Sequence, residues 1–160
     1  MLRPSEPLAA LGPAGHIGIV VEDLDTAIST FSHVVGRFRK LPNDPAGVPI
    51  QTAEGTSVVD LRAAYSIAGP PFIELIQGVP GSLWDRRDGP YVHHIGYWVP
   101  PDEMEKTSAR LTELGLPRLA KRPHEPGQVP RILYHASGDL RIELIDARRR
   151  EELRIGSPDP

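Results

Sequence analysis

Two short phrases occur twice in this chain, in the same order. His-Ile-Gly-Ile at residues 16–19 returns as His-Ile-Gly-Tyr at 94–97, and Ile-Glu-Leu-Ile at 73–76 returns unchanged at 142–145. The chain therefore contains two similar halves, each with one such histidine followed by one such glutamate. Two imidazoles and two carboxylates that meet in a fold would hold one divalent metal ion. The repeat thus predicts a fold of two modules and a metal site shared between them.

Size and composition narrow the class of protein. A chain of 160 residues with 39% hydrophobic and 24% charged residues suits one soluble domain. The net charge of −3 argues against a nucleic-acid partner, which requires a positive surface. The absence of cysteine excludes disulfides, thiolate metal sites and a cysteine nucleophile. Without a long apolar run or a signal-peptide pattern, we expect no membrane partner and a cytoplasmic location.

Hydrophobic periodicity predicts the elements of the first half. We expect a helix that is capped by Asp23 and ended by Gly36, because its apolar residues recur at helical spacing between these two. Residues 42–55, rich in proline and glycine, should form a loop. Strands are predicted at 15–21, 37–41, 56–64 and 71–77.

The second half has the same predicted order of elements. A helix should begin after the cap residue Asp102 and end at Gly115. Strands are predicted at 91–99, 117–122, 129–136 and 140–146. Each half is therefore a strand, a helix and three further strands.

Such a half cannot bury its sheet alone, because one helix covers only one face. Two halves placed side by side can join their sheets into one concave surface that suits a ligand. The sequence thus predicts an α+β fold in which two tandem βαβββ modules form a curved, barrel-like mixed sheet with helices outside. We place this domain at 14–146, with module one at about 14–78 and module two at about 90–146. Residues 1–13 and 147–160 are expected to be flexible tails.

The alternation of side chains along a strand places the repeated polar residues. His16 and His94 lie opposite the aliphatic residues of their strands, and so do Glu74 and Glu143. Because the aliphatic set suits packing on the helices, all four polar side chains can converge on the concave face. The same alternation turns His93 to the opposite face, which leaves it a supporting role at most.

Each of these residues also has an ordinary structural interpretation. A histidine at the start of a strand is usually a hydrogen-bonded structural residue. A glutamate in an apolar strand is different, because burying an unpaired carboxylate is costly. A shared cation is the simplest partner for Glu74 and Glu143.

Several other residues carry weaker signals. Glu54 and Tyr134 are further candidates for assisting at the site, whereas His124 and His135 are expected at the surface. The arginine run at 148–150 should face solvent rather than bind an anion. The connector at 81–90 either borders the pocket through Trp84, Arg86 and Arg87 or is an ordinary solvated loop.

The repeated phrases resemble those of the vicinal oxygen chelate superfamily, which includes glyoxalase I, methylmalonyl-CoA epimerase, extradiol dioxygenases and bleomycin-resistance proteins. The resemblance covers about residues 15–146 and implies paired βαβββ modules with a metal on the concave sheet, commonly as a homodimer. It is carried by His-Ile-Gly-Ile-Val-Val-Glu-Asp-Leu at 16–24, Phe-Ile-Glu-Leu-Ile at 72–76, His-His-Ile-Gly-Tyr-Trp-Val at 93–99 and Arg-Ile-Glu-Leu-Ile-Asp at 141–146.

The resemblance implies that four residues occupy the family's metal-ligand positions: His16, Glu74, His94 and Glu143. Their order is similar to that of bacterial glyoxalase I, but the phrases around the histidines resemble the methylmalonyl-CoA epimerase branch. That branch usually has glutamine where Glu74 stands, so its substrate does not carry over directly. The Phe-Ser-His helix ending at 31–33 also lacks the Phe-Tyr pair typical of glyoxalase I.

This ligand set permits proton transfer next to a carbonyl. One divalent ion (Mn, Fe, Co, Ni or Zn) with four protein ligands keeps two positions for the vicinal oxygens of a small-molecule substrate. We expect Glu143 to act as base with Glu74 on the opposite side, which gives epimerase, isomerase or lyase chemistry. Two alternatives stay open: a small-molecule-binding protein of the same fold and an iron-dependent dioxygenase.

Overall fold

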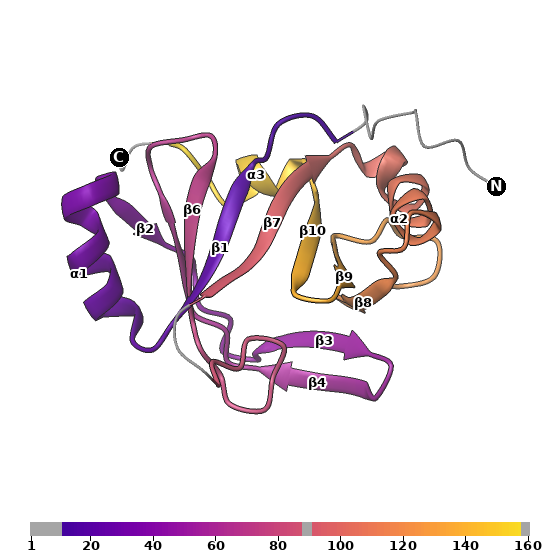
Figure 1. Ribbon diagram of the computed structural model, residues 1–160, viewed down its shortest axis with the longest axis horizontal. Helices are drawn as coiled ribbons and strands as arrows, with labels where there is room; N and C mark the ends of the chain where they lie inside the picture. The colour runs from indigo at the N-terminus through magenta and orange to yellow at the C-terminus, as the bar shows by residue number, and fades with distance from the viewer. Residues whose placement is uncertain (1–10, 88–90, 158–160) are drawn as a thin grey trace.

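Ten strands form one mixed sheet in the computed structural model, which describes residues 11–87 and 91–157 (Figure 1). The sheet curls into a half-barrel, so the predicted α+β class is confirmed. The strands are β1 His16–Val21, β2 Phe38–Lys40, β3 Val48–Thr52, β4 Gly55–Val59, β5 Ala63–Ser66, β6 Phe72–Gln77, β7 Tyr91–Val99, β8 Arg118–Lys121, β9 Ile132–Ser137 and β10 Leu140–Asp146.

The strand order shows the same arrangement in both halves. Taken from the outer strand inward, the order is β2-β5-β6-β1 in the first half and β8-β9-β10-β7 in the second. Within each half the first strand pairs parallel with the last, β1 with β6 and β7 with β10. The halves join where β1 pairs antiparallel with β7. This seam therefore relates the two modules by an approximate twofold axis.

A hairpin in the first half breaks this symmetry. Strand β3 lies within residues 42–55, which were predicted to be a loop, and the predicted strand at 56–64 is divided between β4 and β5. Both predictions were wrong. Pro49 obscured the strand β3, because proline is rare in strands, but it precedes Gln51 and Thr52, the residues of β3 that pair with β8. Through that pairing the hairpin extends the sheet of the other half, and Figure 1 shows it running crosswise below the sheet.

Helix α1 (Leu24–Val35) begins and ends where the sequence predicted. Asp23 accepts a hydrogen bond from the backbone N–H of Thr26 at 2.7 Å. Gly36 follows the helix with a φ of 85°, a conformation that a residue with a β-carbon rarely adopts. The local chemistry of these two residues therefore sets both ends of the helix.

Helix α2 (Met104–Glu113) begins differently from the prediction. A 3₁₀ turn at Pro101–Glu103 precedes it, and Asp102 lies inside this turn. The N-cap position belongs to Glu103, whose side chain makes no capping bond. The prediction of a cap at Asp102 was wrong because Pro101, which suits a first helical position, starts the turn one residue earlier.

The alternation of the strands separates an outer core from an inner one. On the outer face, Val21 and Leu75 pack with α1, whereas Leu133 and Leu144 pack with α2. The inner, concave face has its own core, built from Val20, Ile50, Val59, Ala63, Ile76, Trp84, Ala120 and Tyr134. The predicted parity is thus confirmed for these residues.

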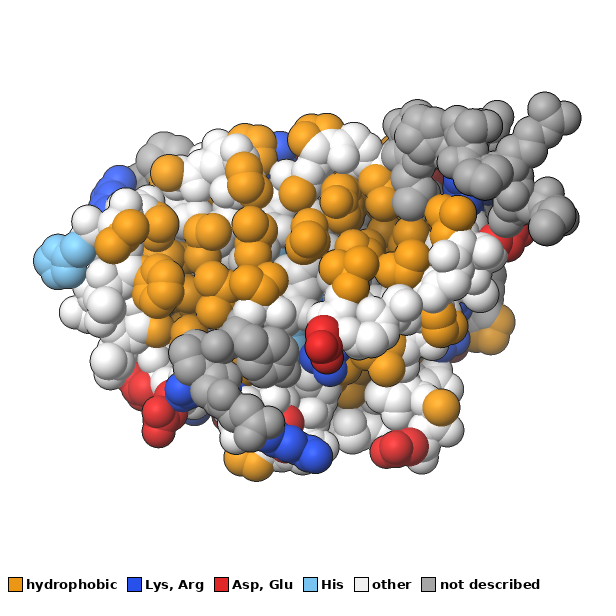
Figure 2. Space-filling model, in the orientation of Figure 1, with side chains coloured by type: hydrophobic (Ala, Val, Ile, Leu, Met, Phe, Trp, Pro, Cys, Tyr) orange, Lys and Arg blue, Asp and Glu red, His pale blue; other side chains and the backbone are white. Residues whose placement is uncertain are grey.

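The outer face is open in its middle, between α1 and α2. Figure 2 shows hydrophobic side chains gathered on this part of the surface. Among the outward residues of β1 and β7, Ile17, Ile19, Ile95 and Tyr97 are only half-buried. In the part of the chain that the structure describes, no helix has the length and apolar character to cross a membrane.

The segment after β10 packs on the domain in its described part. It forms the short helix α3 (Arg148–Glu152), and Ile155 is buried beside Phe72 and Tyr65. This differs from the predicted flexible tail, because the apolar residues Leu153 and Ile155 follow the run of charges and pack on the domain. The predicted N-terminal arm lies largely in residues 1–10, which are outside the described residues, as are 88–90 and 158–160.

Candidate metal centre

The two His-x-Gly phrases face each other across the seam. His16 lies opposite Gly96, and Gly18 lies opposite His94. A β-carbon on Gly96 would stand 1.8 Å from Cε1 of His16, and one on Gly18 would stand 2.2 Å from Cε1 of His94. Each glycine therefore makes room for the imidazole of the other half. The repeat of His-x-Gly is a requirement of this mutual packing.

The two glutamates stand beside these glycines. Glu74 of β6 pairs with the glycine of β1, and Glu143 of β10 pairs with the glycine of β7. The next strand on each side adds a tyrosine, since Tyr65 pairs with Glu74 and Tyr134 pairs with Glu143. Across its paired strands, each half thus contributes a row of neighbouring residues in the order Tyr-Glu-Gly. The next residue in each row, across the seam, is the histidine of the other half.

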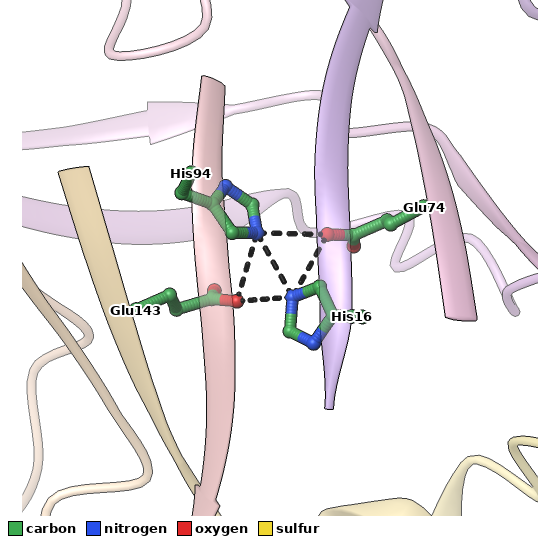
Figure 3. Close-up of side chains that lie close together, drawn as sticks. All are labelled: His16, Glu74, His94 and Glu143. Atoms are coloured by element: carbon green, nitrogen blue, oxygen red, sulfur yellow. Dashed lines mark hydrogen bonds and ion pairs between the residues drawn. The ribbon is translucent and has the colours of Figure 1, made fainter. Parts of the chain in front are cut away.

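Figure 3 shows the four predicted ligands with their side-chain tips together. Nε2 of His16 lies 2.8 Å from Oε2 of Glu143 and 3.5 Å from Oε2 of Glu74. Nε2 of His94 lies 3.0 Å and 3.2 Å from the same two oxygens. All four residues are buried, and their ligand atoms lie within 4.8 Å of one another. Two imidazole nitrogens and two carboxylate oxygens at one point fit a divalent metal of borderline character.

The charges at this point also favour a cation. Burial alone would lower the pKa of His94, but the Glu143 and Glu74 carboxylates outweigh it and raise the pKa to about 10. Burial would raise the pKa of Glu143, yet the attraction of His94 and hydrogen bonds from His16 and His94 hold it well below its usual range. Among the described residues, Oε2 of Glu74 finds no well-formed hydrogen bond. Two buried carboxylates in this state are stabilised by positive charge.

His93 does not point to the outer face, so that prediction was wrong. The pairing of β1 with β7 shifts between Gly18 and Ile19, which removes His93 from the regular register. Such a bulge re-aims a side chain. The ring of His93 lies beside Trp84, with centroids 6.3 Å apart, and beside Tyr134 at 6.2 Å. Both partners belong to the inner core.

The contacts of His93 fix the orientation and tautomer of His94. Nε2 of His93 lies 2.8 Å from the carbonyl oxygen of Leu83, which can only accept, so this nitrogen carries the proton. Burial, followed by the charge of His94, lowers the pKa of His93 to about 3, and the ring is neutral. Its Nδ1 therefore accepts from Nδ1 of His94 at 2.9 Å. That hydrogen bond turns Nε2 of His94 toward the glutamates.

A cleft of about 240 Å³ opens above the two glutamates. Tyr65 and Tyr134 line it near Glu74 and Glu143, and burial followed by these carboxylates raises the pKa of both tyrosines well above 10. Both hydroxyls therefore stay protonated. The walls are mostly apolar, from Leu41, Val48, Ile50, Leu61, Ala63, Trp84, Ile132, Ile145 and Leu153.

Of Trp84, Arg86 and Arg87 in the connector, only Trp84 contributes to the cleft. Trp84 is 2% exposed and lines the cleft, so it both anchors the connector and borders the pocket. Arg86 instead forms an ion pair with Glu22 at 3.0 Å, and Arg87 forms one with Asp85 at 3.2 Å. Neither arginine lines the cleft.

The weaker candidates divide between the site and the rest of the fold. Tyr134 reaches the cleft, whereas Glu54 is exposed near the β3–β4 turn. The surface position expected for His135 was wrong: it is fully buried beneath α2, 2.9 Å from the hydroxyl of Ser108. His124 is half-buried and lines a separate pocket.

Sequence reasoning missed three residues of the cleft. Tyr65 could have been found, because it stands nine residues before Glu74 just as Tyr134 stands nine before Glu143. Arg122 and Arg149 also line the cleft. Nothing in their spacing indicated this, since they come from the β8–β9 loop and from α3.

The fold and the buried cluster together define the class of this protein, a paired-module half-barrel with a potential metal site. Residues 15–134 match the family described as the Glyoxalase/Bleomycin resistance protein/Dioxygenase superfamily. The chain therefore belongs to this superfamily, as the resemblance of its phrases predicted. A search of curated proteins found no sequence that matches significantly.

Structures similar to this chain include methylmalonyl-CoA epimerases. The enzyme from Mycobacterium tuberculosis has a TM-score of 0.55 and 19% identity, covering 91% of this chain and 92% of that one. A Streptomyces coelicolor variant in complex with 2-nitronate-propionyl-CoA has a TM-score of 0.58 and 20% identity, covering 86% and 95%. A variant of 4-hydroxymandelate synthase from Streptomyces coelicolor has a TM-score of 0.55 and 20% identity, covering 84% and 38%.

At these identities the similarity concerns the fold. The likeness to the methylmalonyl-CoA epimerase branch, predicted from the phrases around the histidines, is confirmed at that level. The names of the neighbours include both an epimerase and a synthase, so the fold does not choose the reaction. The reaction has to be argued from the site.

Proposed function

We propose that this protein is a metal-dependent enzyme that transfers a proton next to a carbonyl of a small substrate. The observation that carries the proposal is the buried cluster of His16, Glu74, His94 and Glu143, whose ligand atoms lie within 4.8 Å. Burying two carboxylates without a cation would be costly. The cleft above them has room for a ligand, and the two glutamates of the cluster line it.

One divalent ion, of the Mn, Fe, Co, Ni or Zn type, is the group that these residues would hold. The donor set has nitrogen and carboxylate oxygen without thiolate, which suits these borderline metals. When bound, the ion supplies Lewis-acid polarisation of a carbonyl oxygen and so makes the neighbouring carbon more acidic. His93 supports this role by presenting Nε2 of His94 to the cluster.

The two glutamates are the proposed acid–base groups. Glu143 and Glu74 come from strands on opposite sides of the seam, so a substrate that binds in the cleft over the seam has one carboxylate on each side. Glu143 removes the proton from one face of the carbon, and Glu74 delivers a proton to the other face. The protonated hydroxyls of Tyr65 and Tyr134 are placed to donate hydrogen bonds in the same cleft. This favours epimerase or isomerase chemistry, with a lyase as the related outcome.

A binding protein is the second candidate, favoured by the apolar walls of the cleft. Elemental analysis separates the two: about one tightly bound divalent ion per chain supports the enzyme, whereas a metal-free protein that binds apolar ligands supports sequestration. An iron-dependent dioxygenase would in addition consume oxygen, which an oxygen electrode measures.

The proton transfer itself is tested by deuterium exchange. Methylmalonyl-CoA, the ligand of one similar structure, is a suitable first probe because its acidic carbon lies between two carbonyl groups. In D₂O the metal-loaded protein should introduce deuterium at that carbon of this or a related acyl compound. His16→Ala should abolish metal retention on dialysis, and unchanged metal stoichiometry in that variant would contradict the proposed ligand set.

We also propose a homodimer, the assembly that the family resemblance implies. The open apolar face between α1 and α2 supports it, because large exposed apolar patches are uncommon on monomers (Figure 2). Light scattering should give twice the mass of one chain. A monomer at micromolar concentration would contradict this part of the proposal.

A further inference from the structure

Two arginines stand between the cleft and a second pocket. Arg122 and Arg149 line the cleft together with Glu74 and Glu143. The same two arginines line a more open pocket of about 590 Å³ on their other side. A molecule in the cleft that extends past these arginines therefore reaches the second pocket.

The second pocket carries an excess of positive charge. Its charged lining residues are Arg122, Arg131, Arg148, Arg149 and Glu152. Arg148 is neutralised by the buried Asp146, with Nε 3.0 Å from Oδ1. Of the remaining three guanidinium groups, only those of Arg131 and Arg149 share the carboxylate of Glu152, the latter at 3.5 Å.

Arg122 has no carboxylate partner among the residues that the structure describes. Nε of Arg131 and Nε of Arg149 are buried, and neither has a hydrogen-bond acceptor there. Burial, together with repulsion from Arg131 and Arg122, lowers the pKa of Arg149. Guanidinium groups stay charged even so, because their ordinary pKa lies far above neutral pH. The cluster therefore holds unmet positive charge and unmet donors.

The metal centre does not cancel this charge. Two carboxylates and one divalent ion sum to zero, so the arginines would act on a cleft with a neutral floor. Besides Glu74 and Glu143, the carboxylate that lines the cleft is that of Asp44, which is exposed. An anionic group on the substrate is the natural partner of these guanidinium groups.

Building on the proposed function, we propose that the substrate carries a phosphate group remote from its reacting carbon, and that Arg122 and Arg149 bind this group where the two pockets meet. A carboxylate would satisfy a single guanidinium fork, whereas a dianionic phosphate has enough acceptor oxygens for two or three. Glu152 opposes any anion here, but its pairing with Arg131 and Arg149 offsets its charge. The substrate class is thus a phosphorylated carbonyl compound.

The experiment measures binding of inorganic phosphate to the metal-loaded protein by calorimetry at low ionic strength. Arg122→Gln and Arg149→Gln should each raise the dissociation constant about tenfold, the effect of one charge-assisted hydrogen bond. Arg149→Lys, which keeps the charge without the fork, should fall between the wild type and Arg149→Gln. Arg37→Gln is the matched control, because this exposed arginine lines neither pocket and should leave binding unchanged.

Three outcomes overturn the proposal: phosphate binding that neither arginine variant weakens, absence of phosphate binding, or acetate binding as tight as phosphate. If phosphate binds to the metal ion instead of the arginines, its affinity will fall when the metal is removed but will not change in the arginine variants. Thermal melting of each variant confirms that it is folded, and Arg149→Lys covers a failure of Arg149→Gln to fold. Metal content is measured separately, so a protein that binds phosphate but no metal would refute the proposed enzyme function and leave the arginine site standing.

Discussion

The two halves of this molecule agree at the seam and differ away from it. Around the seam each half supplies the same row of tyrosine, glutamate and glycine and one histidine. Farther out, only the first half has the β3–β4 hairpin, and only the second is followed by α3. The symmetric part forms the candidate metal centre, whereas the asymmetric additions form much of the cleft wall.

The difference between the halves indicates which part of the molecule would bind the metal and which part would bind the substrate. A metal ion needs converging ligands, and an approximate twofold axis supplies them from one repeated phrase. A substrate that has one reacting end and one remote end needs walls that differ, and the hairpin and α3 provide this difference. Substitutions made in matched pairs, one in each half, test this division.

The largest effect is expected at the glutamates. Glu143→Gln should lower turnover by about 100-fold to 10,000-fold, because it removes the proposed base while its amide oxygen can still bind metal. Glu74→Gln should retain deuterium exchange from one stereoisomer but lose inversion, since only the second proton transfer fails. Chiral chromatography and mass spectrometry of the product follow both. Full activity of Glu143→Gln, with metal content unchanged, would remove it from the role of base.

The next effect is expected at the seam glycines. Gly96→Ala and Gly18→Ala each place a β-carbon within 2.2 Å of an imidazole of the other half. Displacing one ligand should weaken metal binding about 100-fold in both variants, as measured by competition with a chelator.

Gly127→Ala serves as control for these glycine variants. Its φ of 81° makes the substitution strained, but nothing lies near its β-carbon. It should lose some stability and keep its metal. If Gly96→Ala and Gly18→Ala bind metal like this control, the mutual packing of His-x-Gly does not position the ligands.

A smaller effect is expected at His93, which supports the ligand His94 through a hydrogen bond. The first half has no counterpart to this support. Gly15 stands at the equivalent position, and Nδ1 of His16 is buried without a partner among the described residues. His93→Phe removes the acceptor for Nδ1 of His94 and should weaken metal binding about 10-fold to 100-fold. The exposed His33→Phe is the control. Equal metal affinity in both variants would show that His94 needs no such support.

The smallest effect compares the starts of the two helices. Asp23→Ala should lower the free energy of unfolding by about 1 kcal/mol, because it removes the capping bond to Thr26. Asp102→Ala should change it by less than about 0.5 kcal/mol, since Asp102 makes no capping bond. Urea denaturation measures both, and equal losses would contradict the difference between the helix starts.

Much of the fold and the cluster could be predicted because the determining signals are local or repeated. Alternation within each strand placed the four polar side chains on one face, and Asp23 and Gly36 marked the ends of α1. The same reasoning failed at His93, where a bulge overrides alternation, and at β3, where Pro49 obscured a strand. A bulge depends on how two strands are paired, and the sequence of one strand does not record it.

By itself, the sequence determined the two modules, the face of each strand and the identity of the four clustered residues, because these follow from periodicity and from an internal repeat. Only the tertiary structure decided that each seam glycine receives the imidazole of the other half, and that a hairpin of the first half joins the second. It alone brought Arg122 and Arg149 to the cleft. The physical reason is that register and docking arise from contacts between residues far apart in the chain, for which no local pattern exists.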